Sequence, residues 1–241
     1  MVFSMHYLSH KTLGEKLPEL EARLGVTFTD QDLLAKACVH TSYVNEHRDD
    51  GLASNERLEF LGDAVLELVT TDALYKQYPS NEEGELTAFR SALVKGENLA
   101  AVARDLGLGE FLLLSHGEEK SGGREKNYLL ANMFESLIGA LYLDRGYEVT
   151  REFIDRHILE HIGEIVEKGL YVDAKSHLQE LTQEEKGLTP SYAVITEEGP
   201  DHNKVFTVGV YVGEELLAEG TGSSKQKAEQ SAATNALQKR G

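Results

Sequence analysis

Apolar residues recur at helical spacing through roughly the first two thirds of the chain. From Lys11 to about Val166 they return every three or four positions, as on one buried face of a helix, and the alternation typical of strands is absent. Helices are expected at residues 55–78, about 86–106, about 128–143 and 150–168, with the glycines at 107, 109 and 146 as stops. This pattern predicts an all-helical domain over residues 1–169.

The spacing changes after Asp173. A helix, three alternating strands and an Ala-rich closing helix are expected, at residues 174–184, 191–196, 204–212, 215–219 and 225–239. Gly169 and the four residues that follow it indicate a short linker. The order α-β-β-β-α predicts a small α+β domain over residues 174–241, and the whole chain is expected to be mainly α with two domains.

Three carboxylates share one face of the helix expected at 55–78. Glu56, Glu59 and Asp63 stand at i, i+3 and i+7, and like charges at this spacing cost roughly a few tenths of a kcal/mol each. The simpler interpretation is a solvated acidic face, and the alternative is a bound hard cation. Phe60 and Gly62, a bulky residue and a poor helix former, lie beside the carboxylates. They favour the cation, because local departures from helix preference often mark function.

A second polar pair lies on the otherwise apolar helix expected at 128–143. Asn132 and Glu135 stand at i and i+3, and polar groups on a core helix need partners. Packing this helix against the first would bring Glu59 and Asp63 to them. The resulting set contains only oxygen ligands, which select Mg²⁺ or Mn²⁺ over zinc.

Three longer motifs follow one another in the helical part: NERLEFLGDAVL at 55–66, PSNEEGELT at 79–87 and KSGGREKNYLLANMFESLIGALYLDRGY at 120–147. Together with the segment after Asp173, they resemble the bacterial ribonuclease III endonucleases over nearly the full chain. The resemblance implies a helical endonuclease domain followed by a double-stranded-RNA-binding domain. The implied activity is metal-dependent hydrolysis of phosphodiester bonds in double-stranded RNA, leaving 5′-phosphate and 3′-hydroxyl ends. Processing of ribosomal RNA precursors and other structured transcripts is the implied role.

The resemblance also assigns roles to individual residues of the helical domain. The implied metal ligands, for Mg²⁺ or a substituting Mn²⁺, are Glu59, Asp63, Asn132 and Glu135; Asp63 and Glu135 are the implied catalytic residues, and Glu56 and Glu83 are implied to line the same valley. The family commonly has Asp where this chain has Asn132. An amide oxygen still ligates but brings no charge, so weaker metal binding is expected unless Glu56 or water compensates.

In the second domain, the resemblance implies that the module reads the A-form shape of an RNA duplex. The implied RNA-binding residues are Ser176, Gln179, Glu180, His202, Ser224, Lys225 and Lys227. The two lysines begin a helix, where ammonium groups and the helix dipole together favour phosphate. The family usually has two adjacent basic residues where this chain has Lys225-Gln226-Lys227, so one contact is expected to be weaker or shifted. For Ser176, a plain surface residue is nearly as good an explanation.

A homodimer is expected, because one carboxylate cluster cuts one strand and two-fold symmetry supplies a second cluster. The resemblance implies that Phe60 is an aromatic plug that enters the partner's surface, which would explain a bulky residue beside the site. The rival function from another class is a non-catalytic RNA chaperone or ribosome-assembly protein of the same fold. Metal-dependent cleavage of duplex RNA would distinguish the two.

Net charge changes the picture of RNA binding. The formal charge is −17, with 17 basic and 30 acidic side chains over residues 1–169 and 7 and 11 over residues 170–241. Neither part is basic, which argues against a simple electrostatic nucleic-acid binder, because phosphate affinity comes mainly from Lys and Arg. Binding is therefore expected to rest on local basic spots and on metal.

Cysteine usage and hydropathy indicate the compartment. Cys38 is the only cysteine, so an intramolecular disulfide is excluded and the reducing cytoplasm is expected. The first residues lack a charged segment followed by a continuous apolar one, and no stretch approaches the roughly 20 apolar residues of a membrane span. A soluble protein without a membrane partner is expected.

Three weaker signals have simpler explanations. The pattern HILEH at 157–161 matches a zinc-peptidase motif, but no third ligand is evident and an amphipathic helix produces it by chance. The loop SGGR at 121–124 lacks the GK[ST] of a phosphate loop. Around it, Lys120, Arg124 and Lys126 either touch RNA phosphates or are merely solvated. His40 is expected to be structural.

Overall fold

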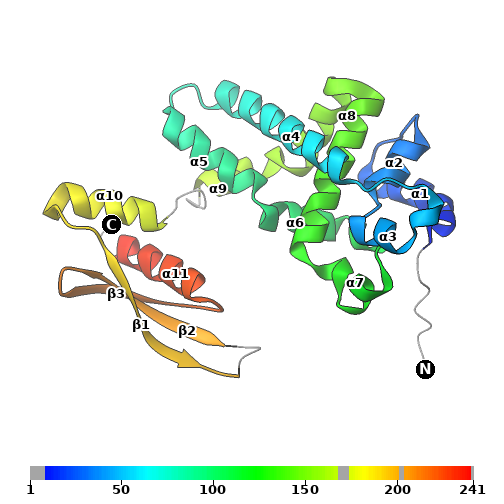
Figure 1. Ribbon diagram of the computed structural model, residues 1–241. Coiled ribbons are helices and arrows are strands. Elements are labelled where there is room, and N and C mark those ends of the chain that lie inside the picture. The colour runs from blue at the N-terminus through cyan, green and yellow to red at the C-terminus, as the bar shows by residue number, and fades with distance from the viewer. Residues whose placement is uncertain (1–8, 168–173, 201–203, 240–241) are drawn as a thin grey trace. The chain divides into compact units, whose positions relative to one another are not determined.

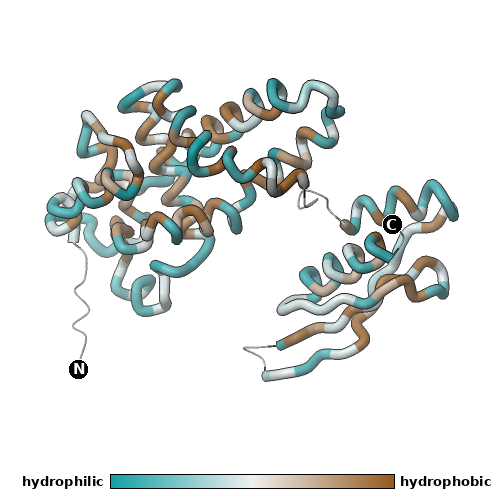
Figure 2. The backbone as a smooth tube through the Cα atoms, turned by 180° about the vertical axis from the view of Figure 1, so that it is seen from behind, coloured by the Kyte–Doolittle hydropathy of each residue, from teal (hydrophilic) through white to brown (hydrophobic). Residues whose placement is uncertain are grey.

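The computed structural model describes residues 9–167, 174–200 and 204–239. The chain divides into two compact units, Met1–Tyr171 and Val172–Gly241. The first is built of helices and the second of a three-stranded sheet with two helices (Figure 1). In both units hydrophobic and hydrophilic positions alternate along the helices (Figure 2). The predicted fold class, a helical domain followed by a small α-β-β-β-α domain, is confirmed.

The first unit contains nine α-helices among its described residues, joined by short 3-10 turns. They are α1 (His10–Leu24), α2 (Gln31–Ala37), α3 (Thr41–Glu46), α4 (Glu56–Gln77), α5 (Glu83–Val94), α6 (Gly96–Asp105), α7 (His116–Lys120), α8 (Asn127–His157) and α9 (Ile162–Glu167). The turns are η1 (Arg48–Asp50), η2 (Leu108–Phe111), η3 (Gly123–Glu125) and η4 (Leu159–His161). An isolated parallel bridge joins Val39 and Leu113.

The long helices α4 and α8 cross near the middle of the first unit (Figure 1). The first half of α8 is apolar on nearly every side, and residues Leu129, Leu130, Met133, Phe134, Leu137, Ile138 and Leu141 are buried in one core. A helix surrounded by other helices needs no polar face. Asn132 and Glu135 are therefore polar residues in a stretch of α8 whose other side chains are mostly apolar and buried.

Three helix boundaries differ from the prediction. The single helix expected at about 86–106 is two helices, because Lys95 has an extended backbone (φ −59°, ψ 142°) and Gly96 follows it. The side chain of Asn98 turns back and donates a hydrogen bond to the carbonyl of Ala92 (2.6 Å), which closes the end of α5. At Gly146 the backbone leaves helical geometry (φ 76°), as expected of a stop, but the helix resumes beyond the kink and ends at His157. The single helix expected at 150–168 is therefore wrong, because η4 divides that range into the end of α8 and α9.

The second unit consists of α10 (Ala174–Lys186), β1 (Ser191–Glu198), β2 (Val205–Val212), β3 (Glu215–Gly222) and α11 (Lys225–Gln238). The antiparallel sheet has the order β1-β2-β3, and both helices pack on one face of it (Figure 1). The core is made largely of alanines, which lets α11 approach the sheet closely. A Cβ atom added to Gly220 would lie 2.0 Å from the backbone nitrogen of Ala232, so this glycine allows the close approach.

Candidate active site

The start of α4 is fixed by Asn55, which is buried. Its backbone N–H donates to the carbonyl of Val39 (2.8 Å), and its side-chain amide donates to the carbonyl of Ala37 (3.1 Å). Its own carbonyl accepts the hydroxyl of Ser136 on α8 (3.4 Å). One residue thus ties the beginning of α4 to the end of α2 and to α8. Sequence reasoning missed this role, although Asn55 is the first residue of the NERLEFLGDAVL motif.

Two glycines form the crossing of α4 and α8. A Cβ atom on Gly62 would lie 1.7 Å from the carbonyl oxygen of Glu135, and one on Gly139 would lie 2.2 Å from the carbonyl oxygen of Leu58. The two backbones are therefore in direct contact, with no side chain between them. Gly62, noted in the sequence as a poor helix former, is required by this packing. Gly139 was missed, because a glycine in an apolar helix gives no sign of which helix it faces.

The crossing brings acidic side chains of α4 and α8 into one electrostatic group. Burial, and after it the charges of Asp63 and Glu59, together raise the pKa of Glu135 to about 7. Burial also raises the pKa of Glu59, as do the charges of Glu56 and Asp63, whereas a hydrogen bond donated by the Asn132 amide opposes the rise. Glu59, Asp63, Asn132 and Glu135 are thus neighbours, with Glu56 beside Glu59.

The chemistry of this donor set fits a hard divalent cation. Four oxygen-bearing side chains lie together, and no Lys or Arg is among the groups that shift the pKa of Glu59 or Glu135. A dication is the group that would offset them. Within the described ranges, no three His, Cys, Asp or Glu side chains are already placed to hold one ion together. The carboxylates are therefore neighbours that repel one another rather than a closed coordination shell.

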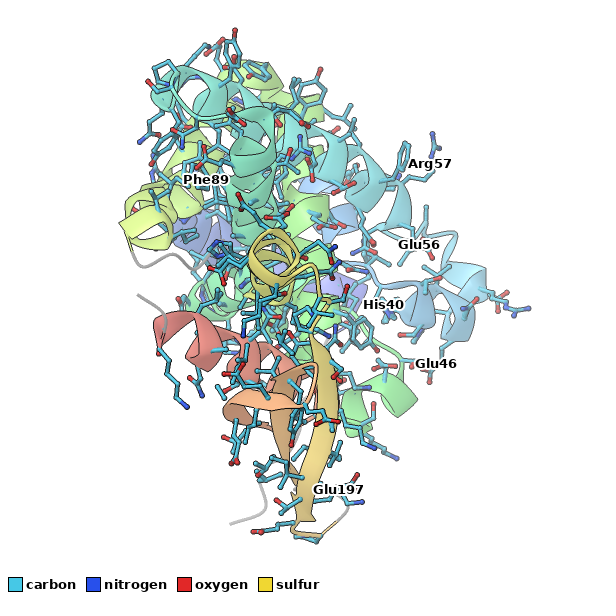
Figure 3. All side chains as sticks on the ribbon, turned by 90° about the vertical axis from the view of Figure 1, so that its left-hand side faces the viewer. His40, Glu46, Glu56, Arg57, Phe89 and Glu197 are labelled. Atoms are coloured by element: carbon cyan, nitrogen blue, oxygen red, sulfur yellow. The ribbon has the colours of Figure 1, made fainter. Side chains whose placement is uncertain are left out.

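Glu56 and Glu83 have different surroundings. Glu56 is exposed at the start of α4, where its hydroxyl partner Ser54 donates to it (2.6 Å), and Figure 3 shows it near Arg57 on the outer side of the helix. Glu83 begins α5 and lines a hollow with Tyr75 and Arg90 beside the second half of α4. Within one chain, Glu56 is thus close to the carboxylates at the crossing of α4 and α8, whereas Glu83 lines a different hollow.

One side of α4 exposes large apolar side chains. Phe60 is 81% exposed, Leu68 58% and Tyr75 73%, and these residues follow one another at seven- and eight-residue spacing on the same helix side. Exposed aromatic and aliphatic side chains gathered in this way are unusual on the surface of a monomer.

Those RNA-binding residues predicted in the second unit that the structure describes are on its surface. Ser176, Gln179 and Glu180 are exposed on α10, where i, i+3 and i+4 spacing puts them on one face. Ser224 caps α11 by accepting the backbone N–H of Lys227 (3.2 Å). Lys225, in the first turn, forms an ion pair with Glu197 (3.2 Å). His202 lies outside the described residues.

The weaker sequence signals resolve into structural roles. His157 is half-buried and packs at a tilt against the ring of Phe153 (4.6 Å between ring centroids), while α8 ends before His161, so the two histidines do not share one helix face. Arg124 donates to the carbonyls of Gly109 and Leu112 (2.7 and 2.9 Å), so its guanidinium is used in holding the loop.

Lys126 and His40 are likewise engaged within the chain. Lys126 forms an ion pair with Glu118. His40 accepts the backbone N–H of Ser42 (3.2 Å) and caps α3, and burial lowers its pKa. In the part of the chain that the structure covers, no helix has both the length and the apolar character needed to cross a membrane.

Comparisons with known proteins agree with this architecture. The family model described as Ribonuclease-III-like matches residues 30–162, and the double-stranded RNA binding motif matches residues 174–240. A Ribonuclease 3 of Pelotomaculum thermopropionicum is 47% identical over 225 residues, covering 93% of this chain and 93% of that protein. A Ribonuclease 3 of Streptococcus agalactiae is 46% identical over 228 residues, covering 93% and 98%.

A solved structure is similar to the first unit. The nuclease domain of a ribonuclease III from Campylobacter jejuni superposes with a TM-score of 0.56 at 39% identity, covering 60% of this chain and 96% of that domain. That structure is described as having flexibility in a region involved in dimer formation.

Proposed function

This chain belongs to the ribonuclease III family, and we propose that the carboxylate group where α4 crosses α8 is its active site. The protein is an endoribonuclease that acts on double-stranded RNA, and the family depends on divalent metal. The observation that carries the site is the pKa of Glu135, raised to about 7 by burial together with two further carboxylates. Perturbed groups of this kind gather at sites of chemistry.

The proposed metal is Mg²⁺, with Mn²⁺ as a substitute, because every donor is oxygen. Glu59, Asp63 and Glu135 would supply carboxylate oxygens and Asn132 its amide oxygen. The hydrogen bond from Asn132 to Glu59 uses the amide nitrogen, which leaves the amide oxygen for the ion. Bound divalent metal acidifies water and stabilises the charge that develops on phosphate oxygens. Glu56 and Glu83 remain proposed members of the valley.

Within this site the protein's own groups position the reaction. Asp63 and Glu135 project from different helices, so a water molecule and a phosphate held between them would contact both. Their carboxylates accept hydrogen bonds from the water and hold it for attack on phosphorus, with the 3′ oxygen as the leaving group. The products would carry 5′-phosphate and 3′-hydroxyl ends.

RNA binding is proposed to depend mainly on the second unit. The exposed face of α10 (Ser176, Gln179, Glu180) would meet a minor groove, together with His202. The start of α11, with Ser224, Lys225 and Lys227, would meet phosphates, because ammonium groups there act with the helix dipole.

A homodimer is proposed through the exposed side of α4. Phe60, Leu68 and Tyr75 form an apolar stripe that a second copy would cover, and two-fold symmetry would supply two sites for the two strands of a duplex. Processing of ribosomal RNA precursors and other structured transcripts, in the cytoplasm, is the role proposed from the family.

The direct test uses the full chain with a perfect RNA duplex, in Mg²⁺ and in EDTA. Fragments with 5′-phosphate ends are expected only with metal, and duplex DNA of the same sequence should stay intact. Binding without cleavage at every Mg²⁺ and Mn²⁺ concentration would instead favour a non-catalytic RNA-binding protein.

The substitution Asn132→Asp tests the ligand assignment. It replaces a hydrogen bond to Glu59 with a like charge, so the metal-free protein should melt at a lower temperature. The added charge attracts the dication, so the Mg²⁺ concentration for half-maximal cleavage should fall about tenfold. Mg²⁺ should then raise the melting temperature of the variant more than that of the wild type.

Asn127→Asp is the matched control, because it makes the same chemical change on α8 but at a residue that bonds Arg104 (2.7 Å). Its metal requirement should equal that of the wild type. If Asn132→Asp needs as much Mg²⁺ as the wild type, or more, the ligand assignment is wrong.

A further inference from the structure

An acidic residue, Glu197, lies beside Lys225, one of the lysines proposed to bind RNA phosphate. Glu197, near the end of β1, reaches the ammonium of Lys225 (3.2 Å) and also that of Lys204, the residue before β2 (3.7 Å). Glu197 is labelled in Figure 3, on the strand that leads toward the β1–β2 connection. One carboxylate therefore lies between two lysines from different parts of the chain.

The position of this carboxylate is set by the sheet. Glu197 stands opposite Phe206 in the register of β1 and β2, and Phe206 stands opposite Gly222 of β3. The ammonium of Lys225 lies over the Phe206 ring, 5.7 Å from its centroid. The ammonium of Lys225 is thus within reach of both the Phe206 ring and its cross-strand partner Glu197. The geometry is held by paired strands and not by a loop.

We propose that Glu197 is an internal competitor for RNA phosphate, occupying Lys225 in the free protein and weakening duplex binding. The proposal rests on the function above, in which Lys225 contacts phosphate. A phosphate that binds Lys225 must either displace the carboxylate or lie close to it, and both cost free energy. In a unit whose balance is already acidic, the loss of one lysine to an internal partner is a large share of the positive charge available.

Glu197 is thereby a residue that sets affinity and salt dependence, and not a contact that reads RNA. A lysine that is already paired has fewer counterions to release when RNA arrives. Its contribution to the slope of log K against log salt concentration is reduced for the same reason.

The test measures duplex RNA binding by the full chain in EDTA or Ca²⁺, so that cleavage does not interfere, over a range of salt. Glu197→Gln should lower Kd by about 1.5- to 5-fold at low salt, the range of an exposed ion pair. The salt slope should become steeper by up to roughly one, and the gain should disappear at high salt. The melting temperature should fall by no more than a few degrees, because an exposed ion pair contributes little to the stability of the fold.

Glu198→Gln is the matched control, because it removes the same charge from the next residue of the same strand. Its Kd should change less than that of Glu197→Gln. In a Lys225→Gln background, Glu197→Gln should have no more effect than the control. A Glu197→Gln variant that binds no more tightly than Glu198→Gln would overturn the inference.

A variant of Lys225 alone tests the assignment on which this inference rests, namely that Lys225 contacts RNA phosphate. Lys225→Gln alone should weaken binding and flatten the salt slope. If binding does not change, Lys225 is not a phosphate contact and the inference fails with that assignment, while metal-dependent cleavage by the wild type would still support the nuclease site.

Discussion

Replacing Glu135 with Gln is expected to abolish cleavage and, at the same time, to stabilise the metal-free protein. Loss of a proposed ligand and catalytic group should slow cleavage by about 1,000-fold or more, equivalent to about 4 kcal/mol. Stability should change in the opposite direction, because the pKa of Glu135 is raised from 4.5 to about 7 in the folded state. An acid whose folded pKa is raised destabilises the fold once the pH exceeds its unfolded value.

The pH dependence of this gain follows from the same shift. The penalty is absent well below pH 4.5, grows between 4.5 and about 7 and is constant above. The full shift corresponds to about 3 kcal/mol, and because the side chain is partly exposed to solvent, roughly 1–2 kcal/mol should be recovered. At pH 8 in EDTA this raises the melting temperature by about 3–6 °C.

The measurement is thermal melting in EDTA at pH 4 and pH 8, with and without Mg²⁺. The wild type should be stabilised by Mg²⁺ and the Gln variant much less. Glu15→Gln, an exposed carboxylate on α1, is the control and should have similar melting temperatures to the wild type. A variant that still cleaves RNA, or that melts lower at pH 8, would refute the proposed role of Glu135.

The substitution Gly62→Ala should have the second large effect, although it adds a single methyl group. That methyl would lie 1.7 Å from the carbonyl oxygen of Glu135, and backbone atoms cannot rotate away as a side chain can. Helices α4 and α8 must separate, at a cost of about 3 kcal/mol or more, the upper end for overpacking. Separation by about 1 Å would also cost roughly 100-fold in cleavage rate, because the carboxylates lie on different helices.

Gly163→Ala provides the control, since Gly163 is likewise on a helix, α9, but is exposed, and a Cβ atom there meets nothing within 4 Å. It should be neutral or slightly stabilising, as alanine is the better helix former. Melting temperature and single-turnover cleavage of both variants give the comparison. Equal stability of the two variants would show that the crossing can adjust without strain.

The sequence predicted where the helices lie along the chain better than how α4 and α8 pack against each other. Spacing alone put Glu56, Glu59 and Asp63 on one helix face, and α4 differs from the prediction by one residue at each end. The break at Lys95 was missed, since the residues around it are apolar at helical spacing and only Gly96 indicates a boundary. The spacing of apolar residues shows which face of a helix is buried, but it does not show which other helix packs against that face.

The site shows the same limit. That Asn132 and Glu135 lie beside the α4 carboxylates was predicted, because polar residues on an apolar helix need partners. The ion pair between Glu197 and Lys225 was not predicted, since it joins residues that only the strand register brings together. Arg124 was one possible RNA contact in the sequence, but its hydrogen bonds to two carbonyls make it part of the scaffold.

The glycine contact between α4 and α8 also limits how this enzyme's metal affinity can be adjusted. Where side chains separate two helices, exchanging a larger residue for a smaller one moves them gradually. Here Gly62 lies against the backbone of α8, so the two helices are already as close as they can be. Substitutions at Gly62 cannot change the distance between them in small steps. At the proposed site, affinity for the ion would then be tuned through the charges of the side chains and not through the helix spacing, and an amide at position 132 in place of a carboxylate would be a change of that kind.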